Sequence, residues 1–462
     1  MNTLQETAID GLRGQLRGDL LQGTDAGYDS ARQIWNAMID KHPALIVRCA
    51  DSADVRAALA FARDNGFRLA VRGGGHNIAG NALCDGGLVI DLSRMRAVHV
   101  DSSARRAYVQ GGALLADVDH ETQSFGLATP LGINSTTGVA GLTLGGGFGW
   151  LSRKYGLSAD NLLSAEIVTA GGELLRTNPT EHPDLFWAIR GGGGNFGVVT
   201  TFEFALHAVG PLVTAALIVF PFDQARQVLT RYRNLVPQLG DDVSVWAVLR
   251  KAPPLPFLPE NVHGSEVVVM AFFSPLPPDE VSAELNLVRA FGNPHGEMAG
   301  AMPYVAWQRI FDPLLAPGAR NYWKSHNFAD LGDEAIDTVV RHAGALPSAH
   351  TEIFLGLLGG QASRLAADAI AYPHRDALYV MNVHGRWTEP GEDDACISWA
   401  RAFFAETAPY ASTGVYINFM TQDEGSRIAA AYGGNYARLK AIKQRYDPHN
   451  LFRQNQNIAP AA

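Results

Sequence analysis

The sequence is poor in cysteine. Its 462 residues include only Cys49, Cys84 and Cys396, which lie far apart and form no CxxC pair. This spacing favours neither a disulfide framework nor a zinc site, and it is typical of a reducing compartment. We therefore expect a cytoplasmic protein that carries no metal.

The sequence also lacks long apolar runs and an excess of positive charge. No run reaches the ~18 apolar residues of a membrane span. The N-terminal stretch MNTLQETAIDGLRGQLRGDLL contains acidic residues instead of the apolar core of a signal peptide. The formal net charge of -9 argues against a nucleic-acid partner. With 47% hydrophobic and 18% charged residues, the composition predicts a globular chain of two or three domains that binds neither membrane nor nucleic acid.

Glycine, by contrast, is abundant, and the 48 glycines gather in three clusters in the first half of the chain. The clusters are RGGGHN (72–77), GVAGLTLGGGFGWLSRKYGLSADN (138–161) and RGGGGNFGVV (190–199). Because glycine costs backbone entropy, such clusters indicate tight turns or places where a ligand touches the backbone. His76 follows three glycines directly, so it either borders a ligand site or stands by chance in a strained turn.

Short strands and helices alternate around these clusters. Apolar patterning predicts strands at 44–50, 68–75, 86–95 and 106–112, helices at 51–66 and 113–126, and a hairpin at 164–177. From about Pro211 the glycine clusters stop, and the patterning predicts strands at 214–222, 243–251, 265–273, 350–360 and 378–387, with helices at 223–239, 277–292 and 392–411. The chain therefore contains two α+β regions.

The third glycine cluster contains a G-x-G-x-x-G match at Gly192, Gly194 and Gly197. A dinucleotide fingerprint needs a strand before the glycines and a helix after them. Here a helix is predicted at 182–190 and a strand at 197–206, which is the reverse order. We therefore expect no Rossmann site, although the amides of such a loop can still bind phosphate.

In their order, the blocks RGGGHN, GVAGLTLGGGFGWLSRKYGLSADN, PDLFWAIRGGGGNFGVVT, Y-x-N and YDPHNLFRQNQNI resemble the berberine-bridge-enzyme-like branch of the vanillyl-alcohol-oxidase flavoproteins, especially its small bacterial members. The resemblance covers nearly the whole chain. It implies an α+β fold, with a two-subdomain PCMH-type FAD-binding domain at 1–206 and 413–462. It also implies an inserted α+β substrate domain at 207–412, an antiparallel sheet covered by helices.

The resemblance further implies that FAD is covalently attached at His76. Many relatives carry a second link through a cysteine, but Asn134 stands at the matching position here, so a single link is expected. The resemblance assigns cofactor binding to Arg72, Gly73, Gly74, Gly75, His76, Asn77, Gly80, Leu131, Thr136, Thr137, Gly138, Gly141, Gly145, Gly146, Gly147, Phe148, Gly149, Asn161, Gly194, Gly197, Val198, Val199, Tyr416, Asn418 and Asn455.

For catalysis the resemblance points to Tyr416, Thr137 and Glu352. Tyr416 belongs to the Y-x-N block, where it either handles a proton or packs on the flavin; its spacing to Asn418 predicts one shared strand face. Thr137 matches the position that gates oxygen access. Glu352 either replaces an acid that relatives carry at the position of Phe354 or lies on the surface.

Other polar or aromatic residues remain open. Asn382, His384 and Arg386 alternate along one predicted strand, so they share a face that lines a cavity or meets water. Trp150 follows the second glycine cluster and is a candidate cavity residue. The polar tail residues 455–457 either reach into the site or are solvated.

The function that the resemblance implies is removal of a hydride from a small organic substrate: an alcohol, an amine or a secondary-metabolite intermediate. Molecular oxygen would reoxidise the FAD and leave as peroxide. A dehydrogenase with another electron acceptor and a noncatalytic flavin-binding protein are the alternatives. The expected assembly is a monomer or a homodimer.

Overall fold

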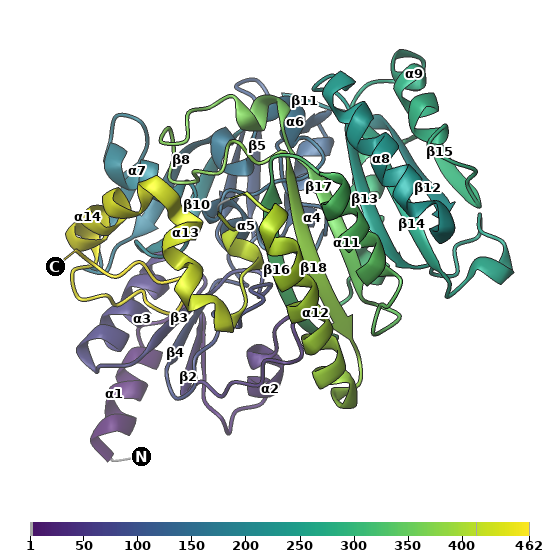
Figure 1. Ribbon diagram of the computed structural model, residues 1–462. Coiled ribbons are helices and arrows are strands. Elements are labelled where there is room, and N and C mark those ends of the chain that lie inside the picture. Colours follow the sequence, from purple (N-terminus) through teal and green to yellow (C-terminus); the bar gives the residue numbers. More distant parts are fainter. Residues whose placement is uncertain (1–2, 413, 462) are drawn as a thin grey trace.

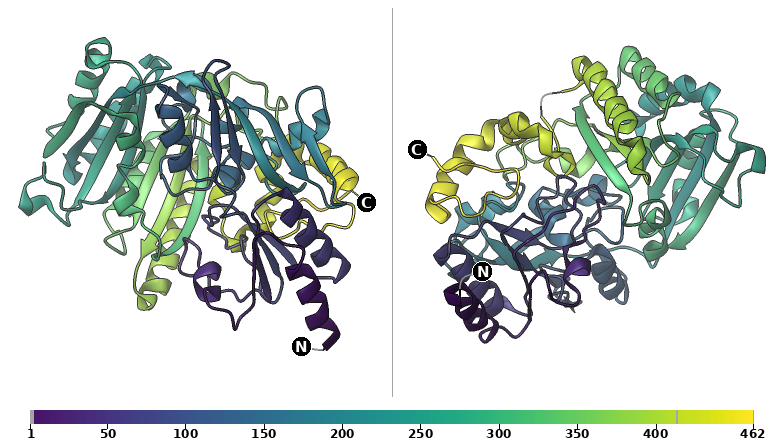
Figure 2. Two further views of the ribbon diagram at one scale, coloured as in Figure 1. Left: turned by 180° about the vertical axis from the view of Figure 1, so that it is seen from behind. Right: turned by 90° about the horizontal axis from the view of Figure 1, so that it is seen from below.

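The computed structural model describes residues 3–412 and 414–461, which form three sheets of four or more strands, a separate two-stranded pair and their helices (Figure 1). The two smaller sheets come from the first half of the chain, and the large sheet comes from the second half. The C-terminal segment returns to lie beside the N-terminal half, as the views from behind and from below show (Figure 2).

The N-terminal sheet has four strands, and three neighbouring strands, one of them an edge strand, run parallel. A helix connects the first two of these three in chain order, as is usual for parallel strands. The carboxylate of Asp51 caps the helix after the second strand by accepting hydrogen bonds from the amides of Ala53 and Asp54. In spatial order the strands are β1 (Asp19–Leu21), β2 (Leu45–Arg48), β4 (Leu88–Asp91) and β3 (Leu69–Arg72), with helices α1 (Thr3–Arg13), α2 (Tyr28–Arg32) and α3 (Ser52–Asp64).

The second sheet has five antiparallel strands and contains the predicted hairpin. In spatial order its strands are β5 (Val98–Asp101), β6 (Arg106–Gln110), β10 (Val198–Ala205), β8 (Leu162–Val168) and β9 (Leu174–Thr177), and a separate pair joins β7 (Leu127–Ala128) to β11 (His207–Ala208). Helices α4 (Leu115–Gln123), α5 (Val139–Leu144), α6 (Ser152–Tyr155) and α7 (Pro183–Ile189) accompany it. Because α7 precedes the third glycine cluster and β10 follows it, the predicted helix–loop–strand order is confirmed.

The large sheet has seven antiparallel strands with helices packed on one face (Figure 1). In spatial order its strands are β15 (Gly296–Pro303), β12 (Leu212–Pro221), β14 (Glu266–Ser274), β13 (Ser244–Lys251), β17 (Glu352–Leu357), β18 (Tyr379–Trp387) and β16 (Arg320–Phe328). Its helices are α8 (Ala225–Leu235), α9 (Pro278–Arg289), α10 (Tyr304–Gln308), α11 (Asp333–Ala343) and α12 (Asp393–Thr407). Strands β15 and β16 and helix α11 were not predicted.

The C-terminal segment packs back onto the first half through α13 (Ile428–Tyr432) and α14 (Tyr436–Tyr446). Lys443 of α14 is fully buried, and its ammonium group bonds the Asp447 carboxylate at 2.7 Å, the Asn195 carbonyl at 2.7 Å and the Phe452 carbonyl at 2.9 Å. These bonds hold the tail against the third glycine cluster. The domain bounds 1–206, 207–412 and 413–462 stay predictions, and their end residues 1, 413 and 462 lie outside the described residues.

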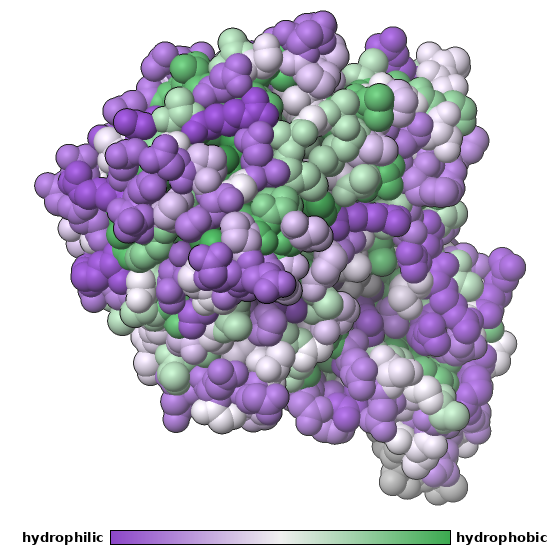
Figure 3. Space-filling model, turned by 90° about the vertical axis from the view of Figure 1, so that its right-hand side faces the viewer, coloured by the Kyte–Doolittle hydropathy of each residue, from purple (hydrophilic) through white to green (hydrophobic). Residues whose placement is uncertain are grey.

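The side of the molecule that carries β15 is mostly hydrophilic, with hydrophobic residues gathered toward its middle (Figure 3). Among residues 3–412 and 414–461, no helix has the length and apolar character that a membrane crossing requires.

Candidate active site

One cavity of about 320 Å³ lies where the glycine-rich loops meet the large sheet. All three glycine clusters border it, together with Phe452 and the polar tail residues 454–456. The lining also includes large-sheet residues Trp246, Trp323, Glu352, Phe354, Asn382 and His384. The cavity therefore joins the region predicted to bind a cofactor to the region predicted to bind a substrate.

The RGGGHN loop begins where β3 ends, and its glycines permit a close backbone crossing. A Cβ at Gly74 would lie 2.4 Å from the amide nitrogen of Gly138, so any side chain there would collide with the second cluster. Gly75 has φ +71, a left-handed conformation that favours glycine. The strained turn thus holds His76 on the cavity wall, where its ring stacks on Trp35 at 5.1 Å between centroids.

A chain of hydrogen bonds fixes the His76 imidazole. Asn134 Oδ1 accepts from the Thr136 amide at 3.0 Å and from the Thr136 hydroxyl at 2.7 Å. Thr136 Oγ1 lies 2.9 Å from His76 Nε2. Since the single hydroxyl hydrogen of Thr136 is donated to Asn134, Nε2 must carry the hydrogen that bonds to Thr136, and Nδ1 keeps its lone pair. Burial, and then the charge of Arg386, lower the pKa of His76 to about 3, so the ring is neutral.

Many of the predicted cofactor residues line this cavity. They are Gly73, Gly74, Gly75, His76, Asn77, Thr137, Gly138, Gly141, Phe148, Gly194, Gly197, Val198, Val199, Tyr416, Asn418 and Asn455. The structure therefore brings residues from all three glycine clusters and from the tail to one ligand site.

The remaining predicted cofactor residues lie off the cavity lining, and their assignment to the cofactor stays a prediction. These residues are Arg72, Gly80, Leu131, Thr136, Gly145, Gly146, Gly147, Gly149 and Asn161. Close packing explains why glycine stands at two of these positions. A Cβ at Gly145 would lie 2.3 Å from the Asn418 side chain, and one at Gly149 would lie 1.9 Å from the Leu131 carbonyl. Asn161 instead donates from its amide to the carbonyls of Tyr155 and Leu157.

A row of polar side chains crosses four strands of the large sheet. The register pairs Arg250 with Glu352, Glu352 with His384, and His384 with Trp323. Glu352 Oε2 accepts from Arg250 Nη1 at 2.7 Å, and Glu352 Oε1 lies 3.1 Å from His384 Nδ1. Burial disfavours the Glu352 carboxylate, but Arg250 and the His384 hydrogen bond outweigh it and lower the pKa of Glu352 to about 2.

This row decides two open alternatives. The Glu352 side chain is 12% exposed and lines the cavity, so its placement on the surface is wrong. Asn382 and His384 line the cavity and do not face water, whereas Arg386 is buried beyond the lining and lies over the Trp35 ring. Trp323 completes the row, but the sequence analysis missed it because strand β16 was not predicted; the aromatic residues of RNYWKSHNF were the available signal.

Three buried polar atoms on this wall have no partner among the described residues: His384 Nε2, Asn382 Oδ1 and Trp323 Nε1. Buried polar groups are normally hydrogen-bonded, since an unpaired one costs about 1–3 kcal/mol. All three residues line the cavity. This wall therefore offers two acceptors and one donor to a ligand.

Tyr416 and Asn418 also line the cavity, but not from a strand, so the predicted strand face is wrong. Residues Ile417–Phe419 form a short 3-10 helix, and the close turn lets Asn418 Nδ2 donate to the Tyr416 hydroxyl at 2.8 Å. Burial raises the pKa of Tyr416 far above its usual value. The phenol is therefore neutral, accepts a hydrogen bond from Asn418 and keeps its own hydrogen to donate.

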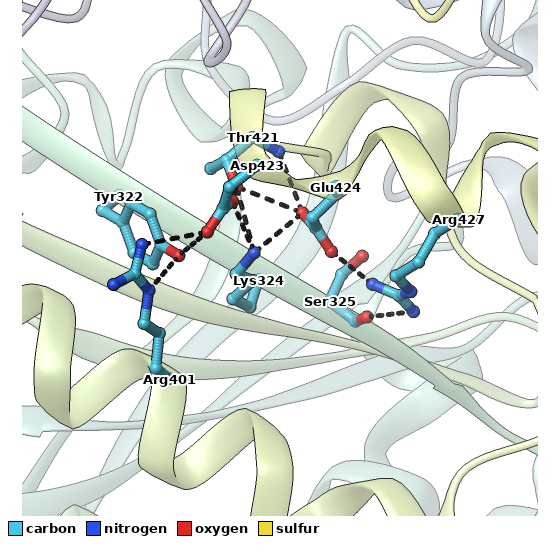
Figure 4. A network of polar contacts seen from close by, with 8 residues as sticks. All are labelled: Tyr322, Lys324, Ser325, Arg401, Thr421, Asp423, Glu424 and Arg427. Atoms are coloured by element: carbon cyan, nitrogen blue, oxygen red, sulfur yellow. Dashed lines mark hydrogen bonds and ion pairs between the residues drawn. The ribbon is translucent and has the colours of Figure 1, made fainter.

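A polar network fastens the segment that carries Tyr416 to the large sheet (Figure 4). Lys324 of β16 bonds Asp423 at 2.7 Å and lies 3.6 Å from the buried Glu424 carboxylate, which in turn accepts from the Thr421 amide at 2.9 Å. Burial disfavours the Asp423 carboxylate, but hydrogen bonds from Lys324, Tyr322 and Thr421 outweigh it and hold its pKa below the usual range. The network fixes the position of the following tail relative to the sheet.

Thr137 and Trp150 stand on different parts of the wall. Thr137 lines the main cavity, and its carbonyl accepts from the Leu115 amide at 2.9 Å. Trp150 lines a smaller apolar pocket of about 50 Å³, where it stacks on Trp246 at 4.3 Å. The two pockets share Trp246, Glu352 and Phe354, so the small one lies beside the polar row.

Comparison with known proteins accounts for this arrangement. The FAD binding domain family matches residues 43–178, and the family described as berberine and berberine like matches residues 415–459. The chain is 30% identical to (R)-6-hydroxynicotine oxidase of Paenarthrobacter nicotinovorans, over 96% of this chain and 97% of that protein. It is 31% identical to the uncharacterised FAD-linked oxidoreductase YgaK of Bacillus subtilis, over 96% of this chain and 98% of the relative.

Solved structures agree with the sequence relatives. The crystal structure of 6-hydroxy-D-nicotine oxidase from Arthrobacter nicotinovorans superposes with a TM-score of 0.87, at 28% identity over 96% of this chain and 98% of that one. The structure of BBE-like #28 from Arabidopsis thaliana gives 0.84 at 25% identity, over 96% and 98% of the two chains. This chain belongs to the berberine-bridge-enzyme-like family. It is an FAD-linked oxidoreductase with the PCMH-type FAD-binding fold, as the sequence analysis predicted.

The cavity of this oxidoreductase fits an FAD. Gly141 and Gly194 line it, and a Cβ at either position would meet no atom within 4 Å, so both backbones are open toward a ligand. Asn455 lines it as well and has a buried Oδ1 without a partner among the described residues. Bare backbone and an unpaired amide oxygen suit a ligand with apolar rings and hydrogen-bonding edges.

Proposed function

We propose that this oxidoreductase is an oxidase that binds FAD covalently through His76 and removes a hydride from a small alcohol or amine, with molecular oxygen as the final oxidant. The observation that carries the proposal is the cavity of about 320 Å³, whose lining includes both His76 and the polar residues of the large sheet. When bound there, FAD would supply the hydride acceptor and pass the electrons on.

The hydrogen-bond chain from Asn134 supports a link through His76. The chain leaves Nδ1 as the nucleophilic nitrogen, because Nε2 donates to Thr136. A neutral ring is needed for a free lone pair, and the lowered pKa of His76 keeps the ring neutral at physiological pH. The proposed site of attachment is therefore Nδ1 of His76.

A single link is proposed because no cysteine lines the cavity. Cys49, Cys84 and Cys396 are all buried in other parts of the described structure and none lines the cavity. Asn134 occupies the place of the second attachment, and its Oδ1 is engaged with Thr136. Asn134 thus serves the histidine instead of the flavin.

At the substrate end, Tyr416 would orient the substrate by donating from its neutral hydroxyl, and Glu352 would hold charge on the opposite wall. Thr137 lines the same cavity as His76 and follows Thr136, whose hydroxyl contacts the His76 ring; its small side chain would leave space for oxygen. We also propose that the protein is cytoplasmic, because its free cysteines suit a reducing compartment.

Acid precipitation of the purified yellow protein tests the covalent link. We expect the colour to stay with the precipitate of the native protein and to move to the supernatant for His76→Ala. Mass spectrometry of tryptic peptides should find flavin on the His76 peptide alone; flavin on a cysteine peptide would contradict the single link. A colourless native precipitate would contradict the link itself.

Peroxide release tests the oxidase activity. The protein is mixed in air with benzyl alcohol, benzylamine and 6-hydroxynicotine, and peroxide is measured with and without catalase. We expect at least one donor to bleach the flavin absorbance and to yield peroxide. A donor that bleaches the flavin without peroxide in air would favour a dehydrogenase with another acceptor.

A further inference from the structure

His384 lines the cavity and carries a buried ring nitrogen that no other described group bonds. Its side chain is 5% exposed and its residue lines the cavity. Nε2 is buried and has no partner in residues 3–412 and 414–461, whereas Nδ1 lies 3.1 Å from Glu352 Oε1. The ring edge contacts Trp323 in a T-shaped arrangement at 4.5 Å, which restricts its rotation.

The contact with Glu352 fixes the tautomer of this ring. A carboxylate only accepts hydrogen bonds, so Nδ1 must carry the hydrogen and Nε2 must carry the lone pair. Glu352 is itself held ionised by Arg250, whose guanidinium bonds its other oxygen at 2.7 Å. The Arg250 guanidinium, the Glu352 carboxylate and the His384 imidazole therefore follow one another across three neighbouring strands.

Burial favours the neutral form of His384, and the charged groups around it raise or lower its affinity for a proton. Glu352 on β17, Arg250 on β13 and Arg386 on β18 are the charged groups that influence it. Burial lowers the pKa of His384, the hydrogen bond and charge of Glu352 raise it, and the two arginines lower it further. A proton that arrives at Nε2 would be stabilised by the carboxylate on the far side of the ring.

We propose that His384 is the catalytic proton acceptor, through Nε2, and that Glu352 is a positioning residue that fixes the orientation of the ring and stabilises its protonated form. This inference rests on the proposed function and narrows its substrate: the reacting carbon must bear a hydroxyl or an amine N–H. The O–H or N–H bond breaks and its proton goes to Nε2. The neighbouring C–H bond breaks and its hydride goes to the flavin, while a C=O or C=N bond forms.

The other titratable groups on the cavity wall fit this role less well. Both Glu352 oxygens are already bonded, and its pKa of about 2 makes it a weak base. The Tyr416 hydroxyl is protonated and accepts a hydrogen bond from Asn418, so it can donate a hydrogen bond but is not a base. His76 is engaged through Nε2 and is the proposed attachment site.

Asn382 adds a second recognition point. It lies two residues before His384 on β18, pairs with Phe354 in the register, and has an unpartnered Oδ1. A substrate whose hydroxyl or amine faces His384 would meet another acceptor one strand position away. The wall therefore favours a molecule with two hydrogen-bond donors over a purely apolar one.

Anaerobic stopped-flow reduction tests the assignment with the fastest donor of the alcohol and amine panel. His384→Asn keeps an amide to donate to Glu352 but removes the base, and it should slow flavin reduction by about 10²–10⁴-fold. Reoxidation of the dithionite-reduced variant by air should stay at the wild-type rate. His384→Ala should regain part of its rate with added imidazole. His350→Ala is the matched control, since His350 is exposed near the same strands and does not line the cavity.

Glu352→Gln separates positioning from mere folding. Because the carboxylate raises the pKa of His384, its loss should move the acid limb of the reduction rate to lower pH and lower the plateau. If Glu352 has only a structural role, the yield of folded holoenzyme should fall, but the acid limb of the pH dependence of the reduction rate should stay at the same pH. Reduction of His384→Asn at the wild-type rate, or a limb that does not move, would overturn the assignment.

A substrate-free measurement keeps the inference testable if no donor in the panel works. Holoenzyme labelled with ¹⁵N-histidine should show His384, identified by its loss in His384→Asn, with a protonated Nδ1 and an unprotonated Nε2 at pH 7. The opposite tautomer would overturn the inference. If the tautomer is as expected but no donor reduces the flavin of the wild-type protein, the proposed alcohol or amine oxidation is wrong, and the tautomer of His384 is still confirmed.

Discussion

Replacing Thr136 by valine removes the hydroxyl that accepts from His76 Nε2 while keeping the shape of the side chain. As Nδ1 forms a bond to carbon, the imidazole gains positive charge, and the hydrogen bond from Nε2 becomes charge-assisted. Such a bond is worth about 1.5–3 kcal/mol, which corresponds to roughly 10- to 100-fold in rate. We therefore expect Thr136→Val to incorporate FAD covalently about 10- to 100-fold more slowly.

The assay mixes flavin-depleted protein with FAD and follows covalent incorporation by flavin fluorescence in a denaturing gel. Thr136→Ser should restore the rate, because the hydroxyl returns. Ser135→Ala is the matched control: the Ser135 hydroxyl bonds Asp312 at 2.5 Å, so its loss loosens the same loop without touching His76. Wild-type incorporation by Thr136→Val, or equal slowing by Ser135→Ala, would refute the role of the hydrogen-bond chain.

The remaining predictions concern other residues of the cavity wall and one buried acid. Tyr416→Phe loses one donor and should slow anaerobic flavin reduction about 10- to 100-fold in stopped-flow absorbance, while air reoxidation persists; unchanged reduction would leave Tyr416 a packing role. Thr137→Val should do the reverse and slow only reoxidation. Reoxidation at the wild-type rate would mean that Thr137 does not control oxygen access. Burial raises the pKa of Asp119 to about 7, although Gln308 donates to it at 3.2 Å. Relative to ~3.9 in the unfolded chain, this amounts to up to about 4 kcal/mol of destabilisation, which grows as the pH rises from 4 to 7 and is complete above 7. Asp119→Asn should therefore unfold later than wild type in urea at pH 8 and alike at pH 4, and equal midpoints at pH 8 would contradict the raised pKa.

Local rules predicted much of the chain. The Asp51 cap and the apolar periodicity gave α3, and the Gly171–Gly172 turn gave the β8–β9 hairpin. The order of helix and strand around the third glycine cluster was enough to exclude a Rossmann site. The resemblance of the motif blocks to one family pointed to FAD and to His76, because those motifs are contiguous in sequence.

The sequence by itself determined which loops are rich in glycine and which strands are apolar, since both depend on near neighbours. Only the tertiary structure decided that Arg250, Glu352, His384 and Trp323 form one row, because cross-strand register joins residues from four distant segments. It likewise decided that the 145–149 glycines support packing instead of lining the cavity, because close contacts with Asn418 and Leu131 set their spacing. Burial and charge environment are properties of the packed chain, so the ionisation of Glu352 and the open acceptor of His384 could appear only there.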